Sequence, residues 1–395
     1  MLYFNCDYNE GAHEKIMERL NRTNREQTSG YGCDAYCEQA KALILEKCQA
    51  KEAAIHFLVG GTQTNAIVIA AALRTHQGVI AAQTAHINVH ETGAIEAGGH
   101  KVLAIMSDNG KLTAEQIEEC YHTHMEDDSR EHIVQPKLVY LSQPTELGTL
   151  YSLAELEAIS QACRRNRLFL FVDGARLGYG LAAYDNDVSL ADLARLCDVF
   201  YIGGTKVGAL FGEAVVIPNP LLQEDFRYII KQHGGMLAKG RLLGIQFMTL
   251  FEENSCEEGV NKEGSCGEDV SKEGSCEEGS CEEGVSKENS CGEDAWEANV
   301  CGETLYEKLG RYADGLAEQI REVLYQKKVP FLVESHTNQI FPILPDAALE
   351  KLGESYIFSY QERIDQTHSA VRICTSWASE RLAVERLCKD LGEVL

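Results

Sequence analysis

Two short strings in this chain each carry a strand-length apolar run into chemically active side chains. Residues 168–172 are continuously apolar and end at Asp173, and residues 199–202 are followed, after two glycines and a threonine, by Lys206. In an open parallel sheet, ligands bind beyond the carboxyl ends of the strands, so we expect this carboxylate and this amine to lie together. The pair predicts a pyridoxal 5′-phosphate (PLP) site, where a lysine holds the cofactor's aldehyde and a carboxylate holds its protonated pyridine nitrogen.

A phosphate cradle and a ring-stacking group can be found elsewhere in the sequence. Gly61 and Thr62 open a helix rich in Ala, Ile and Val, whose backbone N–H groups can meet an anion. Thr205, beside the lysine, can add a second hydroxyl, and His86 can stack on a pyridine ring. Taken alone, the glycines are also compatible with a simple turn and His86 with a hydrogen-bonded loop histidine. A nicotinamide site is disfavoured, because no Gly-x-Gly-x-x-Gly string follows a strand and opens a helix.

The elements that must position these side chains alternate along the chain. Short apolar strands are predicted at residues 78–82, 101–105 and 137–142. Ser152 begins a predicted helix, with Glu155 at the capping-box position. One long helical stretch is predicted over residues 220–251. Continuously apolar strands separated by helices are typical of a mostly parallel sheet with helices on both faces, so the fold class is α/β.

Three segments are predicted. Residues 1–251 form a large α/β domain with an N-terminal segment, and residues 304–395 form a smaller α+β domain. Between them, residues 252–303 hold six cysteines in an acidic decapeptide repeat that is too poor in apolar residues to build a core. This repeat is interpreted as a flexible insertion or, alternatively, as a thiol- and carboxylate-rich metal sponge. No Cys or His spacing in it defines a zinc site, so we expect no structural metal.

The composition excludes several classes of function. The net charge is −25, of which residues 252–303 hold −14, so an extended nucleic-acid interface is not expected. No apolar run reaches the roughly 20 residues of a membrane span. The N-terminus lacks the features of a secretory signal, so we expect a cytoplasmic protein with reduced cysteines.

The order of the motifs resembles that of the threonine aldolase and β-eliminating lyase family, which consists of fold-type I PLP enzymes. The strings are Gly-Gly-Thr-Gln-Thr-Asn at 60–65, Ala-His at 85–86, Val-Asp-Gly-Ala-Arg at 172–176, Lys206, and Val-Arg-Ile-Cys-Thr at 371–375. The resemblance covers nearly the whole chain outside residues 252–303. It implies a fold-type I PLP-dependent transferase fold and a homodimer or homotetramer with active sites at the subunit interface.

The resemblance also implies a role for each matching residue. Lys206 would hold the cofactor aldehyde, Asp173 the pyridine N–H, and His86 the face of the ring. Gly61 and Thr62 would hold the phosphate. Arg176 and Arg372 are candidates to bind the substrate carboxylate and the cofactor oxygens.

Departures from the family pattern concern the substrate. Many members have a histidine near the substrate hydroxyl, where this chain has Glu146; Glu146 could take over the proton transfer, or His90 or a water could do so. Cys6 stands where the family commonly has serine, and is a candidate substrate contact. The arginine that follows a Gly-Gly-Met string in the family is missing, and Lys239 and Arg241 are the candidates to supply its charge.

The implied reaction is retro-aldol cleavage of a β-hydroxy-α-amino acid to glycine and an aldehyde, a step in amino acid metabolism. Two alternatives stay open. One is a β-eliminating lyase that acts on another amino acid with the same cofactor. The other is a non-catalytic PLP-fold protein recruited for binding or for metal buffering.

Overall fold

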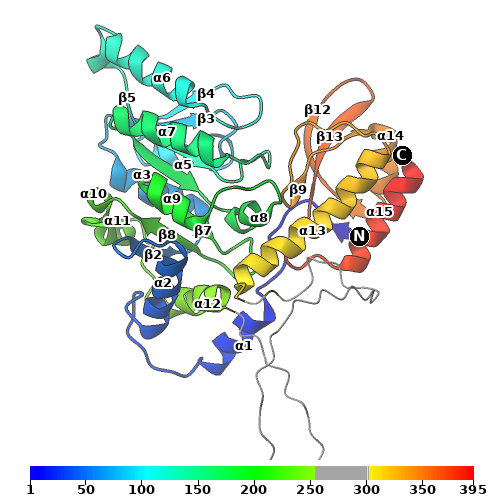
Figure 1. The fold of residues 1–395 in the computed structure, drawn as a ribbon, viewed down its shortest axis with the longest axis horizontal. Helices are drawn as coiled ribbons and strands as arrows, with labels where there is room; N and C mark the ends of the chain where they lie inside the picture. The colour runs from blue at the N-terminus through cyan, green and yellow to red at the C-terminus, as the bar shows by residue number, and fades with distance from the viewer. Residues whose placement is uncertain (254–299, 301) are drawn as a thin grey trace, which may run out of the picture.

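A seven-stranded sheet forms the centre of the larger part of the molecule. The computed structural model describes residues 1–253, 300 and 302–395. In spatial order the strands are β2 (Ala54–Leu58), β8 (Glu213–Ile217), β7 (Val199–Gly203), β6 (Phe169–Asp173), β5 (Gln135–Ser142), β3 (Gln77–Ala82) and β4 (Val102–Ile105). Strand β8 is antiparallel to both of its neighbours, and the other pairs are parallel. The predicted mostly parallel sheet is therefore confirmed (Figure 1).

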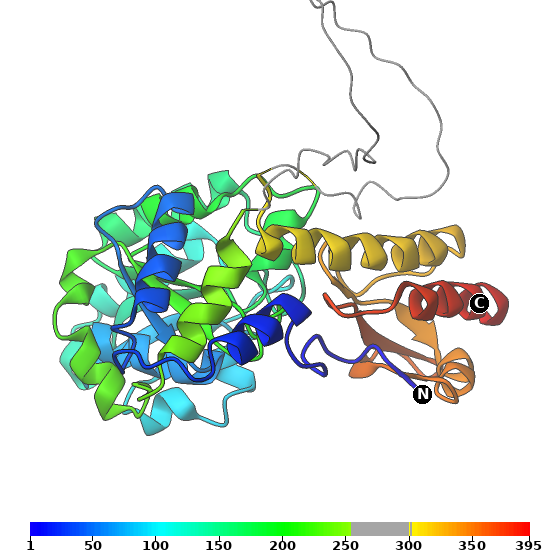
Figure 2. The ribbon, with the colours of Figure 1, turned by 90° about the horizontal axis from the view of Figure 1, so that it is seen from below.

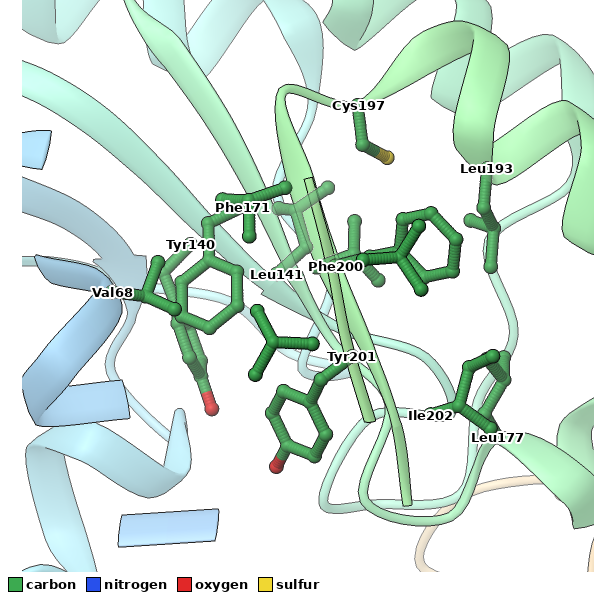
Figure 3. Close-up of a cluster of buried hydrophobic side chains, with 14 of the residues drawn as sticks. Val68, Tyr140, Leu141, Phe171, Leu177, Leu193, Cys197, Phe200, Tyr201 and Ile202 are labelled. Atoms are coloured by element: carbon green, nitrogen blue, oxygen red, sulfur yellow. The ribbon is translucent and has the colours of Figure 1, made fainter. Parts of the chain in front are cut away.

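Helices cover both faces of this sheet. Helix α3 (Gly61–Ala72) packs on one face, while α7 (Leu153–Arg165) and α9 (Leu190–Leu196) pack against β6 and β7. Figure 3 shows Val68 of α3 on one side of the strands and Leu193 of α9 on the other. The remaining helices of this part are α1 (Glu14–Arg22), α2 (Ala35–Lys47), α4 (His86–Val89), α5 (Ala94–Ala97), α6 (Ala114–Glu126), the 3-10 helix η1 (Arg130–His132), α8 (Leu177–Ala182), α10 (Pro220–Gln223), α11 (Phe226–Gln232) and α12 (Arg241–Phe251).

A smaller α+β part begins with the long helix α13 (Leu305–Gln326), which extends across from the large sheet (Figure 2). An antiparallel sheet has the order β10 (Ile343–Pro345), β13 (His368–Cys374) and β12 (Ser359–Arg363), and β9 (Gln339–Ile340) also pairs with β13. Helices α14 (Asp346–Leu352) and α15 (Arg381–Val394) complete it. The N-terminal strand β1 (Leu2–Tyr3) pairs with β11 (Tyr356–Ile357), so the first residues belong to this part in space.

Two local predictions have different outcomes. The helix start at Ser152 is confirmed, since Ser152 and Glu155 form a reciprocal capping box at α7. The single helix over residues 220–251 is wrong, because the chain forms α10, α11 and α12 there. Asp225 has a φ of 58° and Gly234 a φ of 70°, and these left-handed residues interrupt the helical hydrogen bonding.

The acidic repeat lies almost entirely outside the described residues, so its predicted flexibility stays a prediction. Its two flanks are described: Glu253 pairs with Thr304 in an antiparallel bridge, which places the two ends of the segment side by side. No helix in the described parts of the chain is both long and apolar enough to span a membrane.

Candidate active site

A cavity of about 250 Å³ opens at the carboxyl ends of β5, β6 and β7. It is lined by most of the residues that the sequence singled out, namely Gly61, Thr62, His86, Glu146, Asp173, Arg176, Thr205 and Lys206. Tyr8, Tyr201 and Glu213 line it as well. The parallel order of the strands brings these segments together, since each strand delivers its last residue to the same edge of the sheet.

Close approach of two loops brings Asp173 and Lys206 into one cavity. A Cβ atom on Gly174 would lie 1.9 Å from the backbone oxygen of Tyr201, so only glycine allows the chain after β6 to pass this close to β7. The backbone N–H of Gly203 donates to the oxygen of Gly174 at 2.9 Å. Gly174 and Gly203 therefore keep the segment that follows Asp173 beside the end of β7, which precedes Lys206.

Asp173 is buried and receives four hydrogen bonds. Tyr140 donates to Oδ2 and Tyr201 to Oδ1, each at 2.5 Å, and Asn65 Nδ2 and the Ala175 N–H donate at 3.1 and 2.9 Å. Successive side chains of a strand point to opposite faces of the sheet. The register of β5, β6 and β7 therefore places Tyr140 and Tyr201 on the same face as Asp173. Figure 3 shows Tyr140 and Tyr201 on the α3 side of the strands, whereas Phe200 lies on the α9 side. These four donors fix the orientation of the carboxyl group, as a partner for a pyridine N–H requires.

Removal of one tyrosine hydroxyl is expected to weaken this structure. Tyr140→Phe deletes a hydrogen bond to a buried charged group, so the free energy of unfolding should fall by about 1.5–3 kcal/mol. Chemical denaturation measures it. Tyr184→Phe is the matched control, since Tyr184 is 74% exposed and its hydroxyl pairs with His336 on the surface. Equal losses in the two variants would contradict the role assigned to Tyr140.

Lys206 is half-buried in a cavity that also holds Asp173, Glu213 and Arg176. Burial and the neighbouring Arg176 guanidinium lower the pKa of Lys206, while the carboxylates of Asp7, Asp173 and Glu213 oppose that shift. Its Nζ lies 5.9 Å from the centre of the Tyr8 ring. A lowered pKa leaves more of the amine neutral, and the neutral form is the nucleophile that attacks an aldehyde.

The start of α3 supplies backbone donors to the cavity. Gly60 precedes the helix in an extended conformation, and no side chain caps the first turn. A Cβ atom on Gly61 would lie 3.1 Å from the Tyr201 hydroxyl, so the glycine keeps the cavity open there. Thr205 Oγ1 donates to Glu213 Oε1 at 2.8 Å. Glu213 was not identified from the sequence, where its only signal is a lone charge at the start of an apolar strand.

His86 connects to Asp173 through Glu91 and Asn65. Glu91, like Glu213, was not identified from the sequence. The Nδ1 of His86 lies 2.8 Å from Oε1 of the buried Glu91, and the same oxygen accepts from Asn65 Nδ2 at 2.7 Å. Asn65 donates in turn to Asp173. The candidate stacking ring and the candidate pyridine partner therefore belong to one hydrogen-bonded chain, which fixes the orientation of both.

Glu146 lies where this cavity meets an outer one of about 910 Å³. Its Oε1 accepts from Ser142 Oγ at 2.7 Å and from the His86 N–H at 2.8 Å. Burial raises the pKa of Glu146, which makes it a stronger base once it is ionised. His90 lines the outer cavity, with its ring centre 5.6 Å from that of His86. Glu146 is thus the candidate base that faces both cavities.

Arg176 is paired with Asp7 rather than free. Its Nε and Nη2 donate to the two oxygens of Asp7 at 2.7 and 3.0 Å, and Asn338 Nδ2 also donates to Asp7 at 3.0 Å. Burial raises the pKa of Asp7, but Arg176 and Lys206 lower it further, so the net result is about 2. This pair joins the N-terminal segment to both parts of the fold.

The Asp7–Arg176 pair is expected to carry much of the local stability. Asp7→Ala leaves a buried guanidinium unpaired, and breaking a buried pair in this way typically costs about 3–5 kcal/mol. Because the pKa of Asp7 is lowered in the folded state, its contribution is present above the unfolded pKa near 4 and disappears as the pH falls toward about 2. Denaturation at several pH values measures both effects. Glu157→Ala, which breaks an exposed pair with Arg195, should cost about 1 kcal/mol or less; a similar small loss for Asp7→Ala would contradict the assignment.

The other candidates lie at different distances from the chemistry. Arg372 lines the outer cavity and donates to the backbone oxygen of Asn5 at 2.8 Å. Cys6 is buried, donates to Asn9 Oδ1 at 3.2 Å and is absent from the lining of both cavities, to which its neighbour Tyr8 belongs. Arg241 is buried in α12 and donates to the backbone oxygen of Thr23. Neither Lys239 nor Arg241 lines either cavity within this chain.

The residues present fit PLP. The fixed carboxyl group of Asp173 and the half-buried Lys206 line one cavity, and the uncapped start of α3 faces a space that Gly61 keeps open. Among the buried oxygens of the described residues that have no hydrogen-bond partner, Glu213 Oε2 belongs to a residue of the cavity lining. Such atoms are costly in a finished site, which is consistent with a cavity that a polar ligand completes.

Comparisons with known proteins agree with this geometry. Residues 10–342 match the family model described as beta-eliminating lyase. A low specificity L-threonine aldolase of a Pseudomonas species is 31% identical over 254 residues, which are 64% of this chain and 72% of that protein. A solved structure of Leishmania major threonine aldolase has a TM-score of 0.85 and 37% identity over the whole of both chains. A Thermus thermophilus aspartate aminotransferase at 11% identity, TM-score 0.62 and 100% and 96% coverage shares the fold alone, that of fold-type I PLP enzymes.

The predicted fold-type I architecture and the predicted cofactor are therefore confirmed, and the protein is a PLP-dependent lyase. The family match covers the cavity with Asp173, Lys206, Gly61 and His86, and the same residues carried the resemblance in the sequence. The chain belongs to the beta-eliminating lyase family.

Proposed function

We propose that this protein cleaves a β-hydroxy-α-amino acid of the threonine or allo-threonine type to glycine and an aldehyde. The observation that carries the proposal is the position of Glu146. Glu146 lines the inner cavity with Lys206 and Asp173 and also the outer cavity, which we propose as the substrate entrance. A base at this junction can reach a hydroxyl on the carbon next to the reacting centre.

Lys206, Asp173 and His86 are proposed to hold the cofactor. When bound, PLP supplies an aldehyde that condenses with the substrate amine and a ring that takes up the electron pair of the broken Cα–Cβ bond. Lys206 is proposed to hold the aldehyde until substrate replaces it. Asp173 would hold the pyridine N–H, because its carboxyl group is fixed by four donors. His86, fixed by Glu91, would support one face of the ring.

The protein's own residues then direct which bond breaks. Glu146 removes the proton from the substrate's β-hydroxyl, and the Cα–Cβ bond breaks as the aldehyde forms. Ser142 and the His86 N–H hold one oxygen of Glu146, which leaves its other oxygen for the substrate. A buried base with a raised pKa gains more from accepting a proton than an exposed one does.

The substrate carboxylate is proposed to bind Arg372 in the outer cavity. A guanidinium recognises a carboxylate through two parallel hydrogen bonds. Arg176 is held by Asp7, so it is proposed to contribute a fixed positive charge beside the cofactor oxygens rather than a mobile clamp. Cys6 is proposed to act from the same segment, next to Tyr8, at the edge of the substrate site.

The wider setting is also a proposal. We infer a cytoplasmic homodimer or homotetramer with active sites at the subunit interface, as the resemblance to the family implies. The β-eliminating alternative uses the same cofactor residues but needs a leaving group at Cβ instead of a hydroxyl proton. The buried base at Glu146 favours the aldol reaction.

Product analysis with a substrate panel tests this function. Purified, PLP-loaded protein is supplied with L-threonine, L-allo-threonine, an aromatic β-hydroxy amino acid and L-serine, and all products are identified. The proposal expects glycine and the matching aldehyde in equal amounts. A keto acid and ammonia would identify a β-eliminating lyase instead, and no product from any substrate would contradict catalysis of either kind.

A further inference from the structure

Glu213 occupies a position between the start of α3 and Lys206. It is the first residue of β8, which lies between β2 and β7, and it is paired with Leu58 on one side and Gly203 on the other. Leu58 is followed closely by Gly61, and Gly203 by Lys206. Glu213 is 3% exposed and lines the inner cavity together with Gly61 and Thr62.

One oxygen of the Glu213 carboxyl group accepts a hydrogen bond, and the other has no partner among the described residues. Oε1 accepts from Thr205 Oγ1 at 2.8 Å, and Thr205 Oγ1 accepts from the Gly212 N–H at 3.0 Å. These two hydrogen bonds fix the orientation of the Glu213 carboxyl group. Oε2 is buried and has no hydrogen-bond partner in the described parts of the chain. A buried polar atom in this state costs free energy unless a ligand meets it.

Several charged and titratable groups face Glu213 from the elements around it. They are Lys206 after β7, Asp173 at the end of β6, Tyr201 on β7 and Tyr306 on α13. Burial raises the pKa of Glu213 to about 8, with the Asp173 carboxylate acting in the same direction and Thr205 and Lys206 against it. Among the described residues, no ion pair within 4.0 Å joins Glu213 to Lys206. Burial therefore favours the protonated form of this carboxyl group.

The phosphate of a bound cofactor would lie close to Glu213, because Gly61 and Thr62, the expected phosphate cradle, line the same cavity. Its negative charge is attracted to the N–H groups at the start of α3, and an ionised carboxylate beside it would repel it strongly inside a buried cavity. A protonated carboxyl group does the opposite, because its O–H can donate to a phosphate oxygen in a short, charge-assisted hydrogen bond.

We propose that Glu213 is a neutral carboxylic acid that donates from Oε2 to the phosphate of the bound cofactor. Thr205 orients it by occupying Oε1. This proposal rests on the PLP binding stated above and assigns Glu213 to cofactor binding, a role separate from the proton transfer of Glu146. It predicts that the phosphate contribution to binding depends on the proton of Glu213.

Binding of two cofactor analogues that lack the aldehyde tests this without the chemistry of Lys206. The dissociation constants of pyridoxine 5′-phosphate and of pyridoxine are measured by calorimetry for the full-length protein, and their ratio gives the phosphate contribution. Glu213→Gln keeps a neutral donor of the same shape, whereas Glu213→Ala removes it. At pH 7 the ratio should fall about tenfold in Glu213→Ala, the order expected for one charge-assisted hydrogen bond, and by less than about threefold in Glu213→Gln.

The pH dependence separates a donor from a merely structural residue. Between pH 7 and 9 the wild-type phosphate contribution should decrease, because Glu213 loses its proton through a pKa of about 8, and Glu213→Gln should decrease less. Both proteins are also compared in the Lys206→Ala background, because Glu213 and Lys206 each influence the other's pKa. An unchanged ratio in Glu213→Ala, or the same pH dependence in wild type and Glu213→Gln, would overturn the proposal. Failure of the wild type to bind pyridoxine 5′-phosphate at all would instead overturn the cofactor assignment on which it rests.

Discussion

Lys206→Ala is expected to abolish turnover while leaving the fold intact. The variant lacks the amine that holds the cofactor aldehyde, so kcat/KM should fall by about 10³-fold or more, as when one member of a catalytic unit is removed. The visible absorbance of the lysine-bound cofactor should disappear with it. The two readouts are aldehyde release and the absorption spectrum of the PLP-loaded protein.

The control for this variant is Lys101→Ala, since Lys101 is an exposed lysine just before β4. It should keep wild-type turnover and the wild-type spectrum. Because Lys206 lies among several charged groups, circular dichroism should establish that Lys206→Ala is folded. A folded Lys206→Ala protein with wild-type turnover would show that another group performs the chemistry.

Glu146→Gln is expected to have the second largest effect. The amide keeps the size of the side chain but cannot accept the hydroxyl proton, so kcat should fall by about 10²–10⁴-fold, the usual contribution of a general base. The spectrum of the lysine-bound cofactor should be unchanged, because Asp173 and Lys206 are untouched. Steady-state kinetics together with the spectrum measure both.

The pH profile adds a signature that a packing defect would lack. Burial raises the pKa of Glu146, and the base must be ionised to work, so wild-type kcat should rise with pH through that raised pKa on the acidic side. Glu146→Gln should lose this rise. Glu96→Gln, an exposed carboxylate, is the neutral control. If His90→Gln removed the acidic limb and Glu146→Gln kept it, His90 would be the base.

The sequence predicted the cofactor site because its signals are local. Asp173 and Lys206 each follow a continuously apolar strand, and a parallel sheet brings the ends of such strands to one edge. Ser152 and Glu155 likewise form a cap from residues that lie within one turn of each other. Functional side chains that directly follow a strand or begin a helix can therefore be predicted from the sequence alone.

What the sequence could not predict depends on contacts between distant segments. Glu91 and Glu213 are ordinary charged residues in the sequence, and only the fold places them against Asn65 and Thr205. Asp7 pairs with Arg176, 169 positions away. The N-terminal segment begins in the smaller α+β part, where β1 pairs with β11, and reaches the cavity at Asp7. The break of the helix over residues 220–251 depends on a left-handed Asp225, a conformation that aspartate adopts too rarely to be expected.

Locating the cofactor on the chain tests the central claim most directly. The PLP-loaded protein is reduced with borohydride, digested and analysed by mass spectrometry to find the modified lysine. Our account predicts a single stable adduct on the peptide that contains Lys206, in about one copy per chain, and none in Lys206→Ala. An adduct on a different lysine, or a protein that takes up no PLP, would contradict it.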